Sequence, residues 1–514
     1  METRLPRMKA ALIGVLAVGS ALAVGHLVAA FVGIGASPYL AVANSTVDLS
    51  PQWLTEFGKQ FGPEWDKRLL FIAIAVTIAV LAVLAGLLSR RSPVPGTVIA
   101  VVLGVVSIAA VLFRPDLGQL AVLAPAASLL VGLGVFRWLH GLATRQARAE
   151  SADAGADKEI DRRRFLISSG GVAAGVGVAA VGGQFLGSGG DAEKSRRALG
   201  SITAARRAPA IPAGADFASV GTPSFITPND RFYRIDTALT VPSLRAEDWK
   251  LRIHGLVDTE VEYDFDDIRG RELVERVITM TCVSNEVGGP YISTAAFTGV
   301  YLRDLLMEAG VKPEAGQVFA TSVDGWTTAT PVADMLSEER GALLAIGMNG
   351  EPLPLEHGFP ARIVVPGLYG YVSATKWVID LELIRDGEKT FYWQDRKWAK
   401  EAPIKTQSRI DAPRSFQSFP PGKVSIAGIA WAQTTGVERV EVRLDGGQWR
   451  EAELSTEAND QTWRMWKLDV DLTAGAHRAE VRATDRSGYT QVEERVPPIP
   501  DGATGWHSVN FTVG

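Results

Sequence analysis

Long apolar segments near the N-terminus constrain this chain more than any other feature. Four of them lie at residues 10–34, 69–88, 94–113 and 120–136, and a fifth, residues 165–186, follows a polar stretch. Each approaches the ~20 apolar residues that a helix needs to cross the hydrocarbon core of a bilayer. We therefore predict about five transmembrane α-helices, with membrane lipid as their surroundings.

Lysines and arginines set the expected orientation of these segments. They are concentrated at the N-terminus and in the links after the second and fourth segments, at Arg4, Arg7, Lys9, Arg90, Arg91, Arg137, Arg145, Arg148, Lys158, Arg162, Arg163 and Arg164. Cytoplasmic loops carry such an excess in multi-span proteins. The N-terminus is therefore expected in the cytoplasm, and five spans place the larger part of the chain outside the cell membrane.

The motif Arg162-Arg163-Arg164-Phe165-Leu166 stands directly before the fifth apolar segment. It is similar to the twin-arginine signal for protein export. Arginines on the cytoplasmic side of a span also satisfy the charge rule by themselves. Both interpretations stay open from the sequence.

The chain after the apolar segments shows the patterns of strands and short helices. Residues 249–255 alternate polar and apolar side chains, as a strand with one buried face does. One helix is expected after Thr298 as its cap, with an apolar face formed by Leu302, Leu305, Leu306 and Ala309. Another is expected from Thr330 to about Arg340. This mixture predicts an α+β domain.

The last part of the chain changes to short strands without a helical pattern. They are expected at residues 424–431, 437–444, 449–454, 463–470, 477–485 and 509–513. Turn sequences such as Asp445-Gly446-Gly447 separate them. Regular short strands of this kind predict an Ig-like β-sandwich.

These patterns divide the chain into six parts. We predict a four-helix transmembrane region at 1–140, a cytoplasmic linker with the twin-arginine-like motif at 141–164, a fifth transmembrane helix at 165–187, an extracytoplasmic linker at 188–221, an α+β domain at 222–402 and a β-sandwich at 403–514. Lysines and arginines are scattered over the last two domains and the net charge is −5, so nucleic acid is not an expected partner.

Cys282 is the only cysteine in the 514 residues. A lone cysteine is most often a small buried hydrophobic residue. Here it follows the strand-like residues 275–280 and precedes a Gly-Gly-Pro break, so it could also reach into a pocket. A zinc site would need further cysteines or clustered histidines. The functional alternative is a single thiolate that binds a soft metal whose other ligands are not protein.

Several motifs around Cys282 are similar to those of one enzyme family. They are Thr227-Pro228-Asn229-Asp230-Arg231-Phe232-Tyr233-Arg234, Thr281-Cys282 followed by Asn285, the run from Glu356-His357-Gly358 to Leu368-Tyr369-Gly370, Lys376-Trp377, Gly428-Ile429-Ala430-Trp431 and Leu444-Asp445-Gly446-Gly447. With these motifs, residues 227–513 resemble the sulfite oxidase family of molybdopterin oxidoreductases.

The resemblance implies a molybdenum–molybdopterin cofactor, oxygen-atom transfer and a C-terminal domain that often forms a homodimer. Cys282 would be the metal ligand, and Cys282 and Arg234 would be the catalytic residues. The residues implied to hold the cofactor are Tyr233, Arg234, Ile235, Asp236, Thr237, Asp324, His357, Arg362, Ala374, Thr375 and Lys376. Arg and Lys donors suit the phosphate of the pterin.

The chain departs from the sulfite-oxidising members around the metal. Their cysteine is followed by Ala-Gly-Asn-Arg-Arg, whereas Val283-Ser284-Asn285-Glu286-Val287 follows Cys282 here. Trp398 takes the place of the tyrosine that the resemblance leads one to expect there, and the loop after Trp431 has no arginine. Fewer cations weaken the steering of an anionic substrate.

The substrate therefore stays open between a small oxyanion and a sulfoxide-like molecule that is reduced. No haem domain is visible, so electrons would pass to or from a redox partner or a quinone. A third alternative is an anchored binding ectodomain without catalysis.

Overall fold

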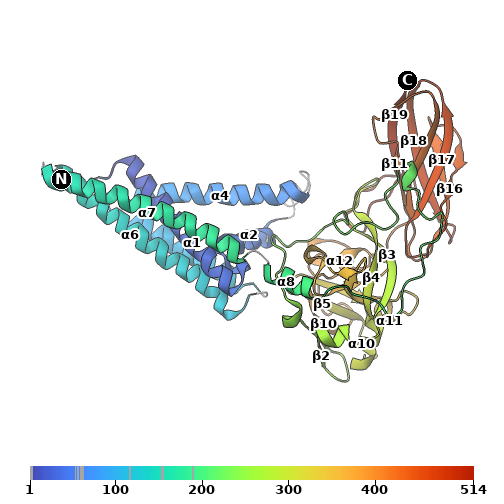
Figure 1. Cartoon of the computed structure of the whole chain (residues 1–514), viewed down its shortest axis with the longest axis horizontal. Coiled ribbons are helices and arrows are strands. Elements are labelled where there is room, and N and C mark those ends of the chain that lie inside the picture. The colour runs from blue at the N-terminus through green and yellow to red at the C-terminus, as the bar shows by residue number, and fades with distance from the viewer. Residues whose placement is uncertain are drawn as a thin grey trace. The chain divides into compact units, whose positions relative to one another are not determined.

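The computed structural model describes residues 4–51, 54, 57, 63–114, 117–151, 155–187 and 190–514. They form two compact units. The helical unit comprises Met1–Gly190 and Thr237–Val241, and the sheet unit comprises Asp191–Asp236 and Pro242–Gly514. Figure 1 shows long helices in the first and β-sheets in the second.

Long helices make up the described part of the helical unit: α1 (Arg7–Val32), α2 (Pro38–Leu49), α4 (Pro63–Leu88), α5 (Val94–Leu112), α6 (Leu123–Ser151) and α7 (Gly155–Gly187). Five stretches within them are long and apolar enough to cross a membrane, and they coincide with the five apolar segments of the sequence. α1 packs against α4, α6 and α7. The approach of α1 to α4 requires glycine, since a Cβ on Gly86 would lie 2.0 Å from the carbonyl oxygen of Ala10.

The polar region between the fourth and fifth apolar segments differs from the expected linker at 141–164. α6 continues to Ser151 and α7 already begins at Gly155, so Arg162, Arg163 and Arg164 lie within a helix. Alanine and arginine are abundant in this region and have high helix propensity, which extends both helices beyond their apolar parts.

The α+β part of the sheet unit contains two sheets. The first has the order β2-β1-β10-β5-β6, with β1 (Lys250–Gly255), β2 (Val261–Asp264), β5 (Gln317–Ser322), β6 (Thr327–Pro331) and β10 (Val378–Ile384). The second has the order β3-β4-β7-β8, with β9 on β7, and comprises β3 (Val274–Thr281), β4 (Ile292–Tyr301), β7 (Leu343–Met348), β8 (Glu351–Pro352) and β9 (Arg362–Val364).

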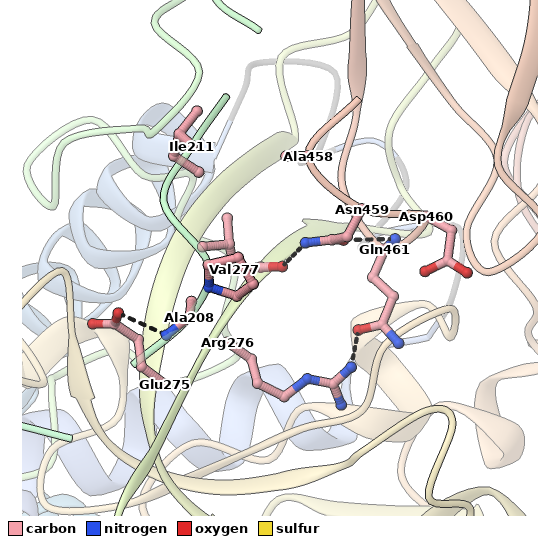
Figure 2. Close-up of a pocket in the computed structure, with 10 residues that line it drawn as sticks. Ala208, Ile211, Glu275, Arg276, Val277, Ala458, Asn459, Asp460 and Gln461 are labelled. Carbon is pink, nitrogen blue, oxygen red and sulfur yellow. Dashed lines mark hydrogen bonds between the residues drawn. The ribbon is translucent and has the colours of Figure 1, made fainter. Parts of the chain in front are cut away.

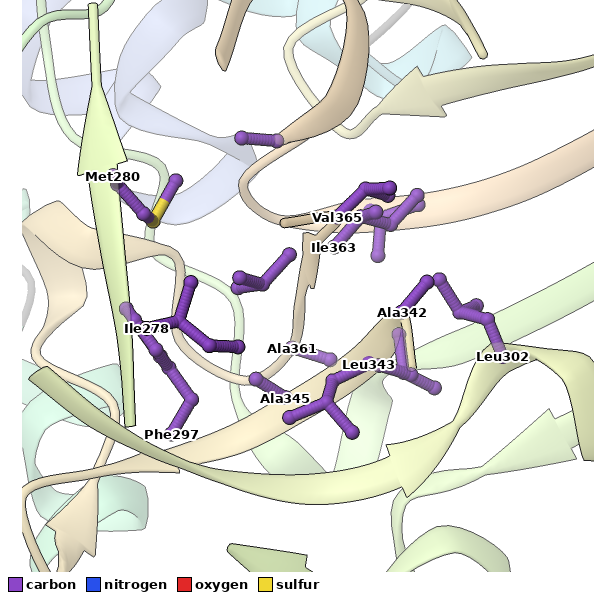
Figure 3. Close-up of a cluster of buried hydrophobic side chains, with 14 of the residues drawn as sticks. Ile278, Met280, Phe297, Leu302, Ala342, Leu343, Ala345, Ala361, Ile363 and Val365 are labelled. Atoms are coloured by element: carbon purple, nitrogen blue, oxygen red, sulfur yellow. The ribbon is translucent and has the colours of Figure 1, made fainter. Parts of the chain in front are cut away.

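Apolar side chains of the second sheet form the core beneath the site described below. Ile278 of β3, Phe297 of β4, Leu343 of β7 and Ile363 of β9 are fully buried and point toward one another (Figure 3). Short helices connect the strands: α9 (Phe265–Arg269), α10 (Leu302–Ala309), α11 (Val332–Leu336) and α12 (Gly370–Ser373). This packing holds the ends of β3 and β9 at fixed positions.

Two further sheets form the C-terminal domain. One has the order β11-β13-β17-β16, with β11 (Gln407–Ala412), β13 (Gly422–Trp431), β16 (Glu453–Leu454) and β17 (Arg464–Leu472). The other has the order β12-β19-β18-β14-β15, with β12 (Ser418–Phe419), β14 (Val437–Leu444), β15 (Trp449–Glu451), β18 (Gly475–Asp485) and β19 (His507–Val513). Ile426 and Trp466 of the first sheet share a buried core with Val481 and Phe511 of the second. The predicted strands are therefore present within two residues of their expected bounds, with one exception. Residues 449–454 form two strands, β15 and β16, in different sheets, and β11 and β12 were not predicted.

Two local predictions in the α+β part need correction. The helix with Leu302, Leu305, Leu306 and Ala309 on its buried face is present, but Thr298 belongs to β4 and does not cap it. The second helix is limited to α11, which ends at Leu336 because Ser337 adopts an extended backbone.

The expected linker at 188–221 also differs, since its described part is ordered. It contains α8 (Gly190–Ala198), and Ser195 donates a hydrogen bond to the Glu247 carboxylate at 2.6 Å. Ile202 and Ala215 are buried in the core of the sheet unit. Composition alone did not indicate these long-range contacts.

Candidate cofactor and metal site

Cys282 follows the last residue of β3, and backbone hydrogen bonds fix it on both sides. Its N–H donates to the Tyr291 carbonyl at 3.0 Å, and its carbonyl accepts from the Asn285 N–H at 3.0 Å. These bonds close residues 282–291 into a turn that we call the Cys282 loop. The thiol is half-buried. A side chain held in one place at the end of a strand is what a metal ligand requires.

Two buried polar atoms beside Cys282 lack a hydrogen-bond partner in the described part of the chain. They are Nδ2 of Asn285, whose Oδ1 accepts from the Tyr291 N–H at 2.8 Å, and Oγ1 of Thr281. Both residues are buried. Because buried polar groups are normally hydrogen-bonded, these two atoms suit a polar group bound next to the thiol.

Arg362 of β9 is a buried cation close to this region, with only 4% of its surface exposed. Its Nη1 donates to the His357 carbonyl at 3.1 Å, and its guanidinium lies over the Phe297 ring at 5.9 Å. Among the described residues no carboxylate pairs with it. Burial lowers its pKa to about 10. A buried, unpaired guanidinium is costly unless an anion binds to it.

His357 and Lys376 lie next to Arg362. His357 Nε2 donates to the Asn229 carbonyl at 3.0 Å. Burial, helped by Arg362 and Lys376, lowers the His357 pKa to about 3, so the imidazole is neutral. Burial lowers the Lys376 pKa to about 8, while the ion pair of its Nζ with Asp236 at 2.8 Å opposes that shift.

The segment around Tyr233 connects this basic group to the thiol. Burial raises the pKa of the Tyr233 phenol, Cys282 raises it further, and Arg362 lowers it. The Tyr233 N–H donates to Ser293 Oγ of β4 at 3.2 Å, and β4 pairs with β3, the strand that precedes Cys282. Asp236 accepts from Arg234 at 2.9 Å as well as from Lys376, so it bridges the two cations.

Asp324, Ala374 and Thr375 come from neighbouring elements. Asp324 Oδ1 accepts from the Trp326 N–H at 3.2 Å. The N–H of Val323 donates to the Trp377 carbonyl at 2.9 Å, which links this turn to residues 374–377. Thr375 is fully buried and its carbonyl accepts from Ile363 of β9. Ser322 Oγ and Trp326 Nε1, which flank Asp324, are buried without a partner among the described residues.

Two predicted site residues are less well defined by contacts. Ile235 is half-buried, and no hydrogen bond of its side chain is possible. Thr237 belongs to the helical unit, so its place in this site stays a prediction.

Two residues of the C-terminal domain contact the Cys282 loop and were missed from the sequence. Arg409 Nη1 donates to the Gly289 carbonyl at 2.7 Å and pairs with Asp411 at 2.8 Å. The His507 ring lies against Gly288, where a Cβ would be 2.3 Å from Nε2. Both stand more than a hundred residues beyond Cys282, and no local pattern marks them.

The residues brought together fit a molybdopterin cofactor. Arg362 and Lys376 offer positive charge to a phosphate, and Asp324 and the orphaned atoms of Ser322 and Trp326 offer polar contacts to a pterin. Cys282 offers one soft thiolate. No group of three or more His, Cys, Asp or Glu able to hold a metal occurs in the described residues.

Family comparisons agree with this chemistry. Residues 238–393 match the oxidoreductase molybdopterin binding domain, and residues 399–513 match the Mo-co oxidoreductase dimerisation domain. An uncharacterized oxidoreductase of Bacillus subtilis, YuiH, is 38% identical over 144 residues, which cover 28% of this chain and 69% of that protein.

The chain belongs to the sulfite oxidase family of molybdopterin oxidoreductases. Its cofactor is molybdenum–molybdopterin. Human mitochondrial sulfite oxidase is 31% identical over 345 residues, which cover 57% of this chain and 62% of that protein. The chain thus spans less than two thirds of the length of the mammalian relatives. Among solved structures, the sulfane dehydrogenase SoxCD of Paracoccus pantotrophus matches with a TM-score of 0.48 and 27% identity, over 52% of this chain and 75% of that chain.

Proposed function

We propose that this protein is a membrane-anchored oxidoreductase that transfers an oxygen atom at a molybdenum bound by Cys282, outside the cytoplasm. The observation that carries the proposal is the segment from Asn229 to Asp236, which contacts both groups. The Tyr233 N–H donates to Ser293 Oγ of β4, the strand beside β3, at 3.2 Å. The Asn229 carbonyl and the Asp236 carboxylate bind His357 and Lys376. These contacts support one site for the thiolate and the buried cations. The matched family domains supply the cofactor class.

The bound cofactor would supply oxygen-atom transfer coupled to two electrons. Cys282 would hold its metal by the thiolate. Arg362 and Lys376 bind the phosphate, and the neutral imidazole of His357 keeps its N–H on the Asn229 carbonyl, which orients this segment. Tyr233, Arg234, Ile235, Asp236, Thr237, Asp324, Ala374 and Thr375 complete the proposed binding set.

Membrane anchoring is supported by the apolar helices. Large apolar side chains are exposed on the outer surfaces of α4 and α5, such as Val76 at 56% and Val98 at 55%. Exposed apolar surfaces of this kind favour contact with a membrane. Together with the charge distribution, they favour a multi-pass anchor and an extracytoplasmic catalytic domain. A redox partner or a quinone would exchange electrons, and the C-terminal domain would form a homodimer.

The charges of residues at the Cys282 loop bear on the choice of substrate. Three cations contact the Cys282 loop or the turn at residues 366–369, and each is paired with an acid: Arg409 with Asp411 at 2.8 Å, Arg340 with Asp334 at 2.7 Å and Lys405 with Asp501 at 2.8 Å. Glu286 on the loop is exposed, and none of the described ion pairs includes it.

This arrangement favours a second candidate over sulfite oxidation, namely the reduction of a neutral sulfoxide-like substrate on the same cofactor. An exposed carboxylate repels an oxyanion, and the paired cations do not offset it. An anchored binding ectodomain without catalysis is the remaining alternative.

Metal content combined with a substrate panel tests these proposals. The full chain from a host that makes molybdopterin should hold about one molybdenum per chain, and Cys282→Ser should lose it. Stoichiometric metal in that variant would exclude Cys282 as the essential ligand. Reduction of sulfoxides with a reduced dye supports the second candidate, turnover of sulfite alone refutes it, and a chain that takes up no molybdopterin supports the binding ectodomain.

A further inference from the structure

β3 delivers Cys282, and it is an edge strand. It pairs only with β4 within its sheet, whose order is β3-β4-β7-β8. Every second residue of an edge strand turns its backbone N–H and C=O away from the sheet. On β3 these residues include Glu275, Val277 and Thr279. What covers this outer edge determines how firmly the strand end is held.

The first half of the outer edge is covered by the segment that precedes the α+β domain. The N–H groups of Ala205 and Arg206 donate to the Leu273 carbonyl at 2.8 and 3.1 Å, and the Glu275 N–H donates to the Arg206 carbonyl at 2.8 Å. Arg206 forms a parallel bridge with Val274. This segment ends its contacts well before Cys282.

The second half is covered by the C-terminal domain. Asn459 Nδ2 donates to the Val277 carbonyl at 3.2 Å, and the Thr279 N–H donates to the Gln461 carbonyl at 3.0 Å. Figure 2 shows the Asn459 bond, with the Gln461 side chain bound to Arg276 nearby. A cavity of about 180 Å³ separates this contact from the preceding segment.

Thr279, three residues before Cys282, is the point where most of these contacts meet. Its carbonyl accepts from Gln433 Nε2 at 2.5 Å, and its Oγ1 accepts from the Trp463 N–H at 2.7 Å. Thr279 is 1% exposed and Gln433 is 5% exposed. A buried carbonyl that loses its donor costs the full desolvation of that group, so these bonds hold the strand end strongly.

The Gln433 side chain contacts both β3 and the C-terminal loop that covers its outer edge. Its Nε2 also approaches the Gln461 carbonyl at 3.4 Å, so one amide touches both β3 and the loop that covers it. It comes from the loop after β13, more than a hundred residues from Cys282. The same domain holds the far end of the Cys282 loop through Arg409 and Gly289.

We propose that Gln433 is a positioning residue for Cys282: its buried amide fixes the end of β3 and thereby the place of the thiol. The C-terminal domain is then part of the active-site framework as well as a separate folding module. The inference rests on the proposed role of Cys282 as metal ligand, but the restraint on the strand end exists with or without the metal.

The sole thiol of the chain gives a direct measurement of this restraint. In the full chain, purified in detergent from a host that makes no molybdopterin, iodoacetamide alkylates only Cys282. Gln433→Met keeps the side-chain length and removes the donor. We expect it to raise the alkylation rate by about tenfold, as the loss of one buried hydrogen bond implies. Gln433→Glu, whose ionised carboxylate cannot donate, should raise the rate at least as much.

Gln407→Met is the matched control. Gln407 is 3% exposed and its amide donates to the Ala503 carbonyl, a bond that stays within the C-terminal domain. It should lower the thermal midpoint without changing the alkylation rate more than twofold. Unchanged alkylation in the folded Gln433 variants, or an equal rise in the control, overturns the proposal. Metal retained in Cys282→Ser would instead refute the proposed function and leave the labelling result intact.

Discussion

Replacing Arg362 by methionine tests the cofactor site through stability, independently of any substrate. In the cofactor-free chain the guanidinium is buried and pairs with no carboxylate of the described residues, and burial lowers its pKa from the ordinary value of 12.5 to about 10. At 1.36 kcal/mol per pKa unit, holding this charge in the folded chain costs roughly 3 kcal/mol at all pH values below its pKa.

The substitution also removes favourable contacts. The bond to the His357 carbonyl and the position over the Phe297 ring contribute about 1–2 kcal/mol together. The difference leaves a net gain of about 1–2 kcal/mol for Arg362→Met in the cofactor-free chain. In the cofactor-containing chain the sign reverses, because the phosphate loses its buried partner.

Chemical denaturation, followed by a signal of the sheet unit, measures the change in stability of the cofactor-free chain and of the cofactor-containing chain. Molybdenum retained after dialysis measures the loss of cofactor binding. Arg464→Met is the control, since Arg464 also donates to backbone carbonyls, those of Ser455 and Val437, but lies in the C-terminal domain. It should destabilise both forms and retain molybdenum. A cofactor-free Arg362→Met chain that is less stable by more than 1 kcal/mol, or one that keeps its molybdenum, would refute the reasoning.

Three other predictions concern different parts of the molecule. Burial, with Arg409 and Arg495, lowers the His507 pKa to about 4, while the unfolded chain titrates near its ordinary 6.5. The unfolded state therefore binds more protons between these pH values, so the stability of the folded chain should fall as the pH drops from 6.5 to 4. The thermal midpoint of His507→Gln should fall less over that range. An equal fall of the midpoint with pH in both proteins would contradict this. Glu286→Gln should raise kcat/KM for sulfite several-fold at low salt and less at high salt, because salt screens the repulsion. An unchanged kcat/KM at both ionic strengths would show that the carboxylate does not repel the substrate. Gly86→Ala should separate α1 from α4 and lower the thermal midpoint in detergent, because its Cβ would lie 2.0 Å from the Ala10 carbonyl oxygen, and a midpoint equal to that of the unchanged chain would contradict the close approach.

Local patterns account for the parts that were predicted correctly. Five apolar segments became long helices because their length and hydropathy are properties of contiguous residues. The short strands of the C-terminal domain followed from alternation and turn residues, and β14 has the predicted bounds Val437–Leu444. The motifs around Cys282, His357 and Lys376 identified the family because each is a short run with a distinctive order.

Features that depend on distant contacts were not predicted. Residues 190–221 are ordered because Ile202, Ala215 and Ser195 meet partners elsewhere in the fold, although their composition is typical of a linker. Thr298 lies in β4 rather than at a helix cap, because pairing with β7 overrides its capping preference.

The sequence by itself therefore determined the apolar helices, the two kinds of sheet domain and the cofactor class, since each follows from a pattern of contiguous residues. Only the tertiary structure decided which cations are paired with acids and that no acid in the described part of the chain pairs with Arg362. It also decided that Gln433 and Arg409 of the C-terminal domain contact the strand and loop around Cys282. Burial and pairing are properties of the folded surroundings, and those surroundings join residues more than a hundred positions apart.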